Sequence, residues 1–213
     1  MGDNSNFNDN FSKLAGRLTN IVLLGFFTTL CSIPIVTAGA SFTALNVATK
    51  AYLFENDDKP LRIFFSSFKK HFALSTKIWL LHILAYAVLI WDYVYYRTSD
   101  ATIDILAAGG IFVTFALLVF ETTMVFVVIG EEKSSKVFET IKIALDISMV
   151  SPLRSGMILF LEAAVVTVVS LLFRGLILIV PGIIAFLAWQ IIPEMLKKYK
   201  FRNSSKVNSD PLQ

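Results

Sequence analysis

Charged residues are scarce in this sequence. Asp, Glu, Lys and Arg make up 16% of the 213 residues, whereas hydrophobic residues make up 55% and the mean hydropathy is +0.68. A water-soluble domain carries nearer a quarter charged residues, because it must cover its surface with them. The shortage excludes an ordinary soluble domain and indicates that much of this chain is solvated by lipid.

Cysteine and the common catalytic motifs are also lacking. The only cysteine, Cys31, can form neither an internal disulfide nor a thiolate metal site by itself. The sequence contains no G-x-x-x-x-G-K-[ST], G-x-G-x-x-G, H-E-x-x-H or G-x-S-x-G motif. We therefore expect no enzymatic activity, no cofactor and no metal, and the net charge of +3, spread over several loops, disfavours nucleic acid as a partner.

Long apolar stretches are what the chain has instead. A membrane-spanning helix needs about 20 mostly apolar residues to cross about 30 Å of hydrocarbon. Five stretches approach this length, near residues 18–37, 78–96, 103–129, 157–173 and 176–192. They predict an all-α, polytopic integral membrane protein with a single helical domain over residues 1–196 and a basic polar tail over 197–213.

The connecting segments alternate between rich and poor in Lys and Arg. Segment 38–77 has six, segment 130–156 has four and the tail has five, whereas 97–102 and 174–175 have one each. Positive residues are retained on the cytoplasmic side of short loops, so we expect the rich segments there. The N-terminus is then outside if all five stretches cross, and inside if the first stretch is re-entrant.

Both cytoplasmic loops show the spacing of an amphipathic helix lying on the inner leaflet. The apolar stripe of the first loop is Leu61, Phe64, Phe65, Phe68 and Phe72, and that of the second is Val137, Phe138, Ile141, Ala144 and Leu145. The order of span, amphipathic helix and span thus occurs twice, through an internal duplication or through shared periodicity alone.

The segment "CSIPIVTAGASFTAL" at 31–45 interrupts the first apolar stretch. Pro34 lacks a backbone donor and Gly39 permits a tight turn, so a helix can bend or end there. Ser41 is one of several small residues here that allow close helix packing, and Thr37 belongs to the same motif. These four residues predict either a helix-packing corner or a broken helix that lines a substrate cavity.

Three ionisable residues lie inside predicted spans. His82, Glu121 and Glu162 each lie roughly 6–12 Å, or one to two helical turns, above the cytoplasmic end of a different span. Such residues are costly in lipid and mark functional sites when they converge, for example as a proton relay or a polar substrate site. The alternative is that each reaches the inner surface or pairs with a basic loop residue.

Several motifs resemble one family of bacterial membrane proteins. They are "LTNIVLL" at 18–24, "SIPIVTAGAS" at 32–41, "TAL" at 43–45, "FFSSFKKHF" at 64–72 and "KIWL" at 77–80. Together they are similar to the YesL-like proteins, domain of unknown function 624, over the first two fifths of the chain. The run "LLGFF" at 23–27 departs from the family pattern, which more often has tryptophan after the asparagine. The resemblance implies the multi-pass bacterial cell membrane as location and an association with carbohydrate ABC importers.

Two hypotheses of function follow. The first is an accessory or regulatory subunit that binds the permease of such an importer, with Phe64, Phe65, Phe68 and Phe72 as the docking face. The second is a stand-alone solute carrier or channel that uses His82, Glu121 and Glu162. A third, ranked last, is that 137–152 is a coupling loop for an ATPase. Membrane lipid is an expected partner, and self-association is left open.

Overall fold

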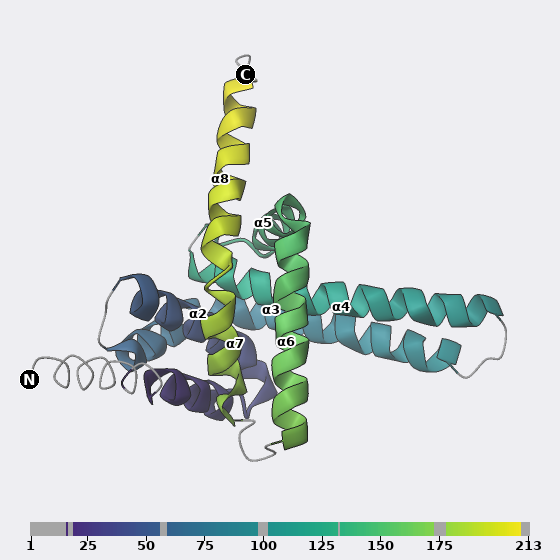
Figure 1. The fold of residues 1–213 in the computed structure, drawn as a ribbon, viewed down its shortest axis with the longest axis horizontal. Helices are drawn as coiled ribbons and strands as arrows, with labels where there is room; N and C mark the ends of the chain where they lie inside the picture. Colours follow the sequence, from purple (N-terminus) through teal and green to yellow (C-terminus); the bar gives the residue numbers. More distant parts are fainter. Residues whose placement is uncertain are drawn as a thin grey trace, which may run out of the picture.

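The computed structural model describes residues 16, 19–55, 59–97, 102–131, 133–172 and 178–209. All regular elements within these ranges are helical, which confirms the all-α class (Figure 1). They are an N-terminal helix (Thr19–Cys31), η1 (Ile35–Thr37), α2 (Ala38–Phe54), α3 (Pro60–Arg97), α4 (Thr102–Gly130), α5 (Val137–Val150), α6 (Pro152–Leu172), α7 (Val180–Ala188) and α8 (Ile192–Ser209).

The first apolar stretch folds as a helical hairpin. The N-terminal helix ends at Cys31, the chain turns through Ser32 to Pro34, and α2 packs back against the same helix through Leu24, Ala44 and Ala48. At about 1.5 Å per residue the described part of the N-terminal helix, Thr19–Cys31, is about 20 Å long, against about 30 Å of hydrocarbon. The stretch predicted at 18–37 is therefore not one continuous helix, because the chain turns at Ser32 to Pro34.

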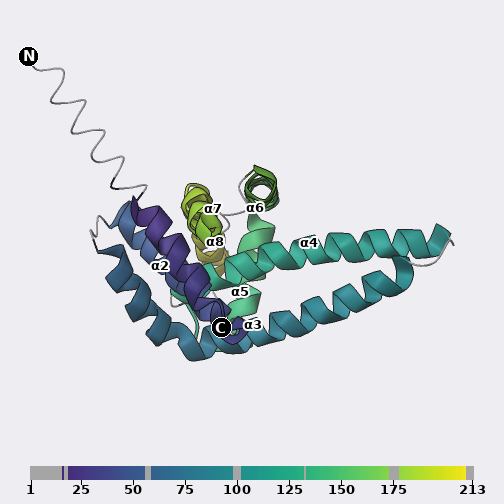
Figure 2. The same cartoon turned by 90° about the horizontal axis from the view of Figure 1, so that it is seen from below.

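The second predicted span and the amphipathic helix before it form one continuous helix. Neither glycine nor proline occurs between Pro60 and Arg97, so nothing ends α3 for 38 residues, or about 57 Å. Figure 2 shows that α3 changes direction along its course, and that its second half and α4 form a long antiparallel arm. The first loop helix is thus not a separate interfacial element.

Two of the described helices are long and apolar enough to cross a membrane by themselves, Pro60–Tyr96 and Leu106–Gly130. The number rises to four if two bent pairs each count as a span, namely α5 with α6, bent by 102°, and α7 with α8, bent by 44°. The sequence predicted five spans. In its described part, the fifth predicted stretch is not one continuous helix, because α7 ends at Ala188 after nine residues and a turn over 189–191 precedes α8.

The second predicted amphipathic helix exists as α5, but its buried face differs from the predicted stripe. The buried residues are Thr140, Ala144, Ile147 and Val150, whereas Phe138 is 85% exposed. Thr140 can be buried because its hydroxyl donates to the Lys136 carbonyl. The predicted basic tail lies largely on α8, and the expected domain boundary at residue 196 falls inside this helix.

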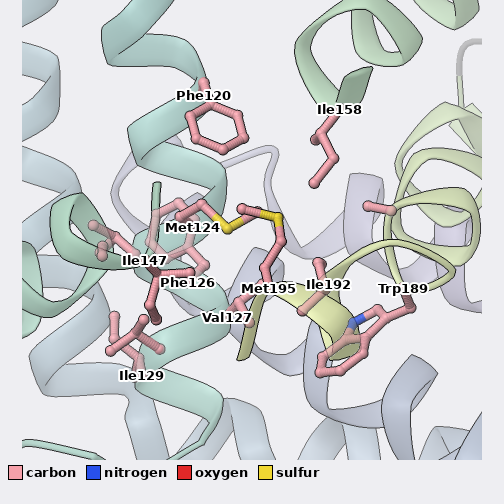
Figure 3. Close-up of a cluster of buried hydrophobic side chains, with 14 of the residues drawn as sticks. Phe120, Met124, Phe126, Val127, Ile129, Ile147, Ile158, Trp189, Ile192 and Met195 are labelled. Carbon is pink, nitrogen blue, oxygen red and sulfur yellow. The ribbon is translucent and has the colours of Figure 1, made fainter. Parts of the chain in front are cut away.

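The main core forms where α4 meets α5, α6 and α8. The side chains of Met124 and Met195 point toward each other there, with Ile147 and Ile158 on either side (Figure 3). A smaller core lies between the N-terminal helix, α2 and the start of α3, and it includes Leu24, Leu45 and Phe64.

Outside these cores the helices present apolar side chains to their surroundings. Trp91 and Val94 on α3, Phe112 on α4 and Phe160 on α6 are all more than half exposed. Extensive exposed apolar surface is unfavourable in water and favourable in hydrocarbon. Together with the two long apolar helices, this surface is that of a helical membrane protein.

Candidate functional site

The helix-break residues form a packing corner. The Thr37 hydroxyl donates to the carbonyls of Cys31 (2.5 Å) and Pro34 (2.7 Å), and so ties the turn together. Ser41 is buried, and its hydroxyl donates to the Thr37 carbonyl. The backbone at Gly39 lies so close to α3 that an added Cβ would sit 2.6 Å from Trp79 Cβ.

Two further contacts fix this corner against α3. Trp79 Nε1 donates to the Ile35 carbonyl at 2.6 Å, and the buried hydroxyls of Thr43 and Ser75 are 2.8 Å apart. Among the described residues that line the pocket presented below, none is a helix-break residue. The geometry supports the corner over the broken helix that lines a cavity.

The predicted docking face is divided. Phe64 is fully buried in the smaller core and is unavailable to a partner, which corrects its predicted role. Phe68 is half-buried, and only Phe65 and Phe72 remain exposed. Phe65 also packs edge-on against Phe27 of the N-terminal helix, with 5.5 Å between ring centroids. The stripe was predicted as a free surface because the hairpin that covers it is not evident from local periodicity.

His82 and Glu121 form a buried pair between α3 and α4. His82 Nδ1 lies 2.8 Å from the Ile78 carbonyl and therefore donates to it, while Nε2 lies 2.5 Å from Glu121 Oε2. The two side chains share one hydrogen bond, and Glu121 Oε1 has no hydrogen-bond partner. His82 is 4% exposed and Glu121 6% exposed, so solvent does not satisfy them.

Glu162 is on α6, and it contacts a different side of α4 from the one that carries Glu121. The Thr123 hydroxyl donates to Glu162 Oε1 at 2.8 Å, and Glu162 Oε2 is buried without a hydrogen-bond partner. Because Glu121 and Thr123 are two positions apart on α4, their side chains point in different directions around the helix. Within the described part of the chain, no three His, Cys, Asp or Glu side chains are placed to hold a metal ion. The three predicted residues thus form two separate sites.

A cavity of about 650 Å³ lies beside Glu162. Its walls come from α2, α3, α4, α6 and α7, and they are mostly aliphatic and aromatic. We call it the intramembrane pocket, because its α3 and α4 residues lie on the two helices that are long and apolar enough to cross a membrane. Its lining includes Phe42, Leu45, Asn46, Trp79, Tyr86, Phe112, Phe115, Thr122, Thr123, Phe126, Glu162, Ala163, Val166, Thr167 and Ile184. Neither His82 nor Glu121 is among the described residues that line it.

The polar side chains of the pocket bind one another and the backbone. Thr122 donates to the Leu118 carbonyl at 2.7 Å, so the hydrogen of the Tyr86 hydroxyl is the one shared with Thr122 Oγ1, also at 2.7 Å. Asn46 donates to the Phe42 carbonyl and accepts from Trp189 Nε1 at 3.2 Å. The pocket therefore has an organised polar side among apolar walls.

Asn46 and the aromatic lining of α4 were not predicted as site residues. Asn46 is 6% exposed in the middle of an apolar helix, and a lone amide in such a helix is the signal that would have indicated it. Phe112 and Phe115 carry no comparable signal, because their spacing is that of any apolar helix.

A cluster of charged residues lies just after the C-terminal end of α4, outside the long apolar segments. Lys50 pairs with Glu131 at 2.7 Å, and the Lys133 ammonium lies 5.2 Å from the centre of the Tyr199 ring. Burial lowers the pKa of Lys133 from its ordinary value, because desolvation disfavours the charged form. The contact between Lys133 and Tyr199 thus connects α8 with the segment that follows α4.

Comparison with known proteins adds one finding. Residues 18–93 match the family described as "Protein of unknown function, DUF624", which confirms the predicted resemblance over that segment. The matched segment runs from the N-terminal helix through most of α3, and it supplies the pocket residues Phe42, Leu45, Asn46, Trp79 and Tyr86. Neither a curated protein nor a solved structure matches the chain.

Proposed function

We propose that this chain is a non-enzymatic membrane protein that binds a small molecule inside the membrane. Residues 18–93 match DUF624, a family described as of unknown function, and the proposal therefore starts from the pocket that this segment helps to build. The observation that carries the proposal is the intramembrane pocket. Its volume of about 650 Å³ lies within the range of about 300–1,000 Å³ that is typical of small-molecule sites.

The composition of the pocket supports ligand binding. Small-molecule sites are mostly apolar with a few placed polar groups, and here Glu162, Thr123 and Tyr86 are such groups among aromatic walls. A free sugar suits this lining poorly, because each sugar hydroxyl removed from water needs a hydrogen-bond partner. The lining of the pocket thus favours an amphipathic ligand over a free sugar. For this reason we prefer the carrier hypothesis to the hypothesis of an importer subunit.

The direct test is binding of a neutral amphipathic probe, 4-phenylbutanol, to the purified protein in detergent, measured by titration calorimetry. We expect saturable binding to the wild type. Ala163 is an exposed residue that lines the pocket, so Ala163→Phe should fill the mouth and abolish binding while the protein keeps its elution volume and thermal stability. If the wild type binds neither 4-phenylbutanol nor the amine and carboxylate of the same shape, 4-phenylbutylamine and 4-phenylbutyrate, we would abandon the proposal.

An accessory subunit of a carbohydrate ABC importer is the second candidate. It rests on the family resemblance and on Phe65 and Phe72, which are 42% and 38% exposed along the first half of α3. Large aromatic side chains are common anchors in protein interfaces.

Co-purification tests this candidate. Tagged protein, extracted in a detergent that keeps importer subunits assembled, should retain those subunits, and Phe65→Ser with Phe72→Ser should release them. Phe138→Ser is the matched control, because Phe138 is an 85% exposed phenylalanine on α5 outside this surface. If the wild type retains no importer subunit, this candidate is rejected and the binding proposal is unaffected.

A further inference from the structure

We infer that the intramembrane pocket selects a ligand with a protonated amine at one end and an apolar body at the other, and that the Glu162 carboxyl group, whose residue lines the pocket, receives the ammonium group. This inference rests on the proposed function, because it specifies the chemical class of the ligand that the pocket binds.

The first support is the state of Glu162. Glu162 is 8% exposed, its Oε1 accepts from Thr123, and its Oε2 is buried without a hydrogen-bond partner. Glu162 is also the only charged residue among the described residues that line the pocket. A buried carboxylate with an open acceptor is costly, and a charge-assisted hydrogen bond from an ammonium group offsets that cost.

The second support is the direction of the other hydrogen bonds. The hydroxyl hydrogens of Tyr86, Thr122 and Thr123 are all committed to acceptors within the protein. The indole N–H of Trp79, which also lines the pocket, is committed to the Ile35 carbonyl. The hydroxyl oxygens of Tyr86, Thr122 and Thr123 therefore offer a ligand acceptors rather than donors, and a ligand that brings its own N–H donors is complementary to them.

The third support is the aromatic wall. Tyr86, Phe112 and Phe115 line the pocket together with Trp79 and Phe126. Aromatic faces attract cations, and the interaction strengthens where water is excluded. The same rings accommodate an apolar body, so one surface serves both ends of an amphipathic amine. A carboxylate ligand would meet Glu162 with like charge and is disfavoured.

The test uses three probes of one shape: 4-phenylbutylamine, 4-phenylbutanol and 4-phenylbutyrate. For the wild type in detergent at neutral pH, we expect the amine to bind about tenfold or more tightly than the alcohol, as a charge-assisted hydrogen bond predicts, and the butyrate to bind weakest. Glu162→Gln keeps the shape of the side chain and should remove the advantage of the amine while alcohol binding changes less than about threefold.

The matched control is Glu194→Gln. Glu194 is an exposed glutamate on α8 that pairs with Arg154 at 2.7 Å and does not line the pocket, so this variant should bind all three probes as the wild type does. Comparison of the three probes on the wild type alone remains decisive if Glu162→Gln does not fold.

A free amine and the ethanolamine headgroup of a lipid offer the same chemistry, and a second arm separates them. Wild-type protein in nanodiscs of phosphatidylglycerol is compared with protein in nanodiscs that also contain phosphatidylethanolamine. If phosphatidylethanolamine weakens amine binding to the wild type, and this effect is absent in Glu162→Gln, the natural source of the ammonium group is the lipid headgroup. If amine binding is equal in the two kinds of nanodisc, the source is a free amine.

The failures are distinguishable. If the alcohol binds as tightly as the amine and Glu162→Gln changes neither, the ammonium inference is overturned and the pocket proposal stands. If none of the three probes binds the wild type, the proposed function itself is overturned.

Discussion

A close contact between α2 and α3, both within the segment that matches DUF624, gives the sharpest prediction of stability. Gly39 lies in the first turn of α2, where a Cβ would meet Trp79 Cβ at 2.6 Å and the Ser75 carbonyl oxygen at 2.7 Å. Neither atom is the free end of a flexible side chain. The substitution Gly39→Ala therefore forces α2 and α3 apart.

The magnitude follows from two opposing effects. Overpacking a well-packed contact costs about 1–3 kcal/mol. Alanine returns up to about 1 kcal/mol over glycine through its higher helix propensity. We expect a net loss of about 1–2 kcal/mol, or an apparent Tm about 2–8 °C lower for a chain of this size.

Thermal unfolding in detergent, followed by circular dichroism, measures this loss. Gly110→Ala is the matched control, because Gly110 is also helical and an added Cβ there meets nothing within 4 Å. We expect the control to unfold at the wild-type temperature or slightly above it. If Gly39→Ala is as stable as Gly110→Ala, the close approach of α2 to α3 is refuted.

Three other predictions concern the remaining sites, and each is measured by the same thermal assay. Phe64→Ala should cost about 3–5 kcal/mol because Phe64 is fully buried, whereas Phe65→Ala, at a 42% exposed position, should cost far less; equal losses would contradict the division of the phenylalanine stripe. Glu121→Leu alone should cost about 3 kcal/mol because it leaves His82 Nε2 unpaired, and Glu121→Leu with His82→Phe should recover most of that loss; additive losses would argue against the pair. Burial lowers the pKa of Lys133, so between that lowered value and 10.5 the unfolded chain binds more protons than the folded one. The stability of the wild type relative to Lys133→Met should therefore rise with pH across that window. A difference in stability that stays constant with pH would contradict the shift.

Composition and periodicity were enough to predict the class of this protein. Scarce charge and long apolar stretches indicate helices in lipid, and α4 and α6 lie close to the stretches predicted at 103–129 and 157–173. The motif at 32–41 also indicated a helix break, because proline and small residues act locally on the backbone. Glu162 was identified from the sequence for the same kind of reason, since a carboxyl group in an apolar stretch is conspicuous wherever it points.

Which residues contact one another was decided only by the tertiary structure. Periodicity shows that Phe64 and Phe65 belong to one stripe, but only the packing of the N-terminal helix and α2 against α3 buries the first and leaves the second exposed. Likewise, Glu121 and Glu162 look equivalent along the chain, yet the packing of α3, α4 and α6 pairs Glu121 with His82 and places Glu162 at the pocket, with one carboxyl oxygen that has no hydrogen-bond partner. The physical reason is that hydrophobicity and backbone preference act between near neighbours, whereas a pocket is enclosed by helices far apart in sequence, whose contacts depend on how every one of them packs.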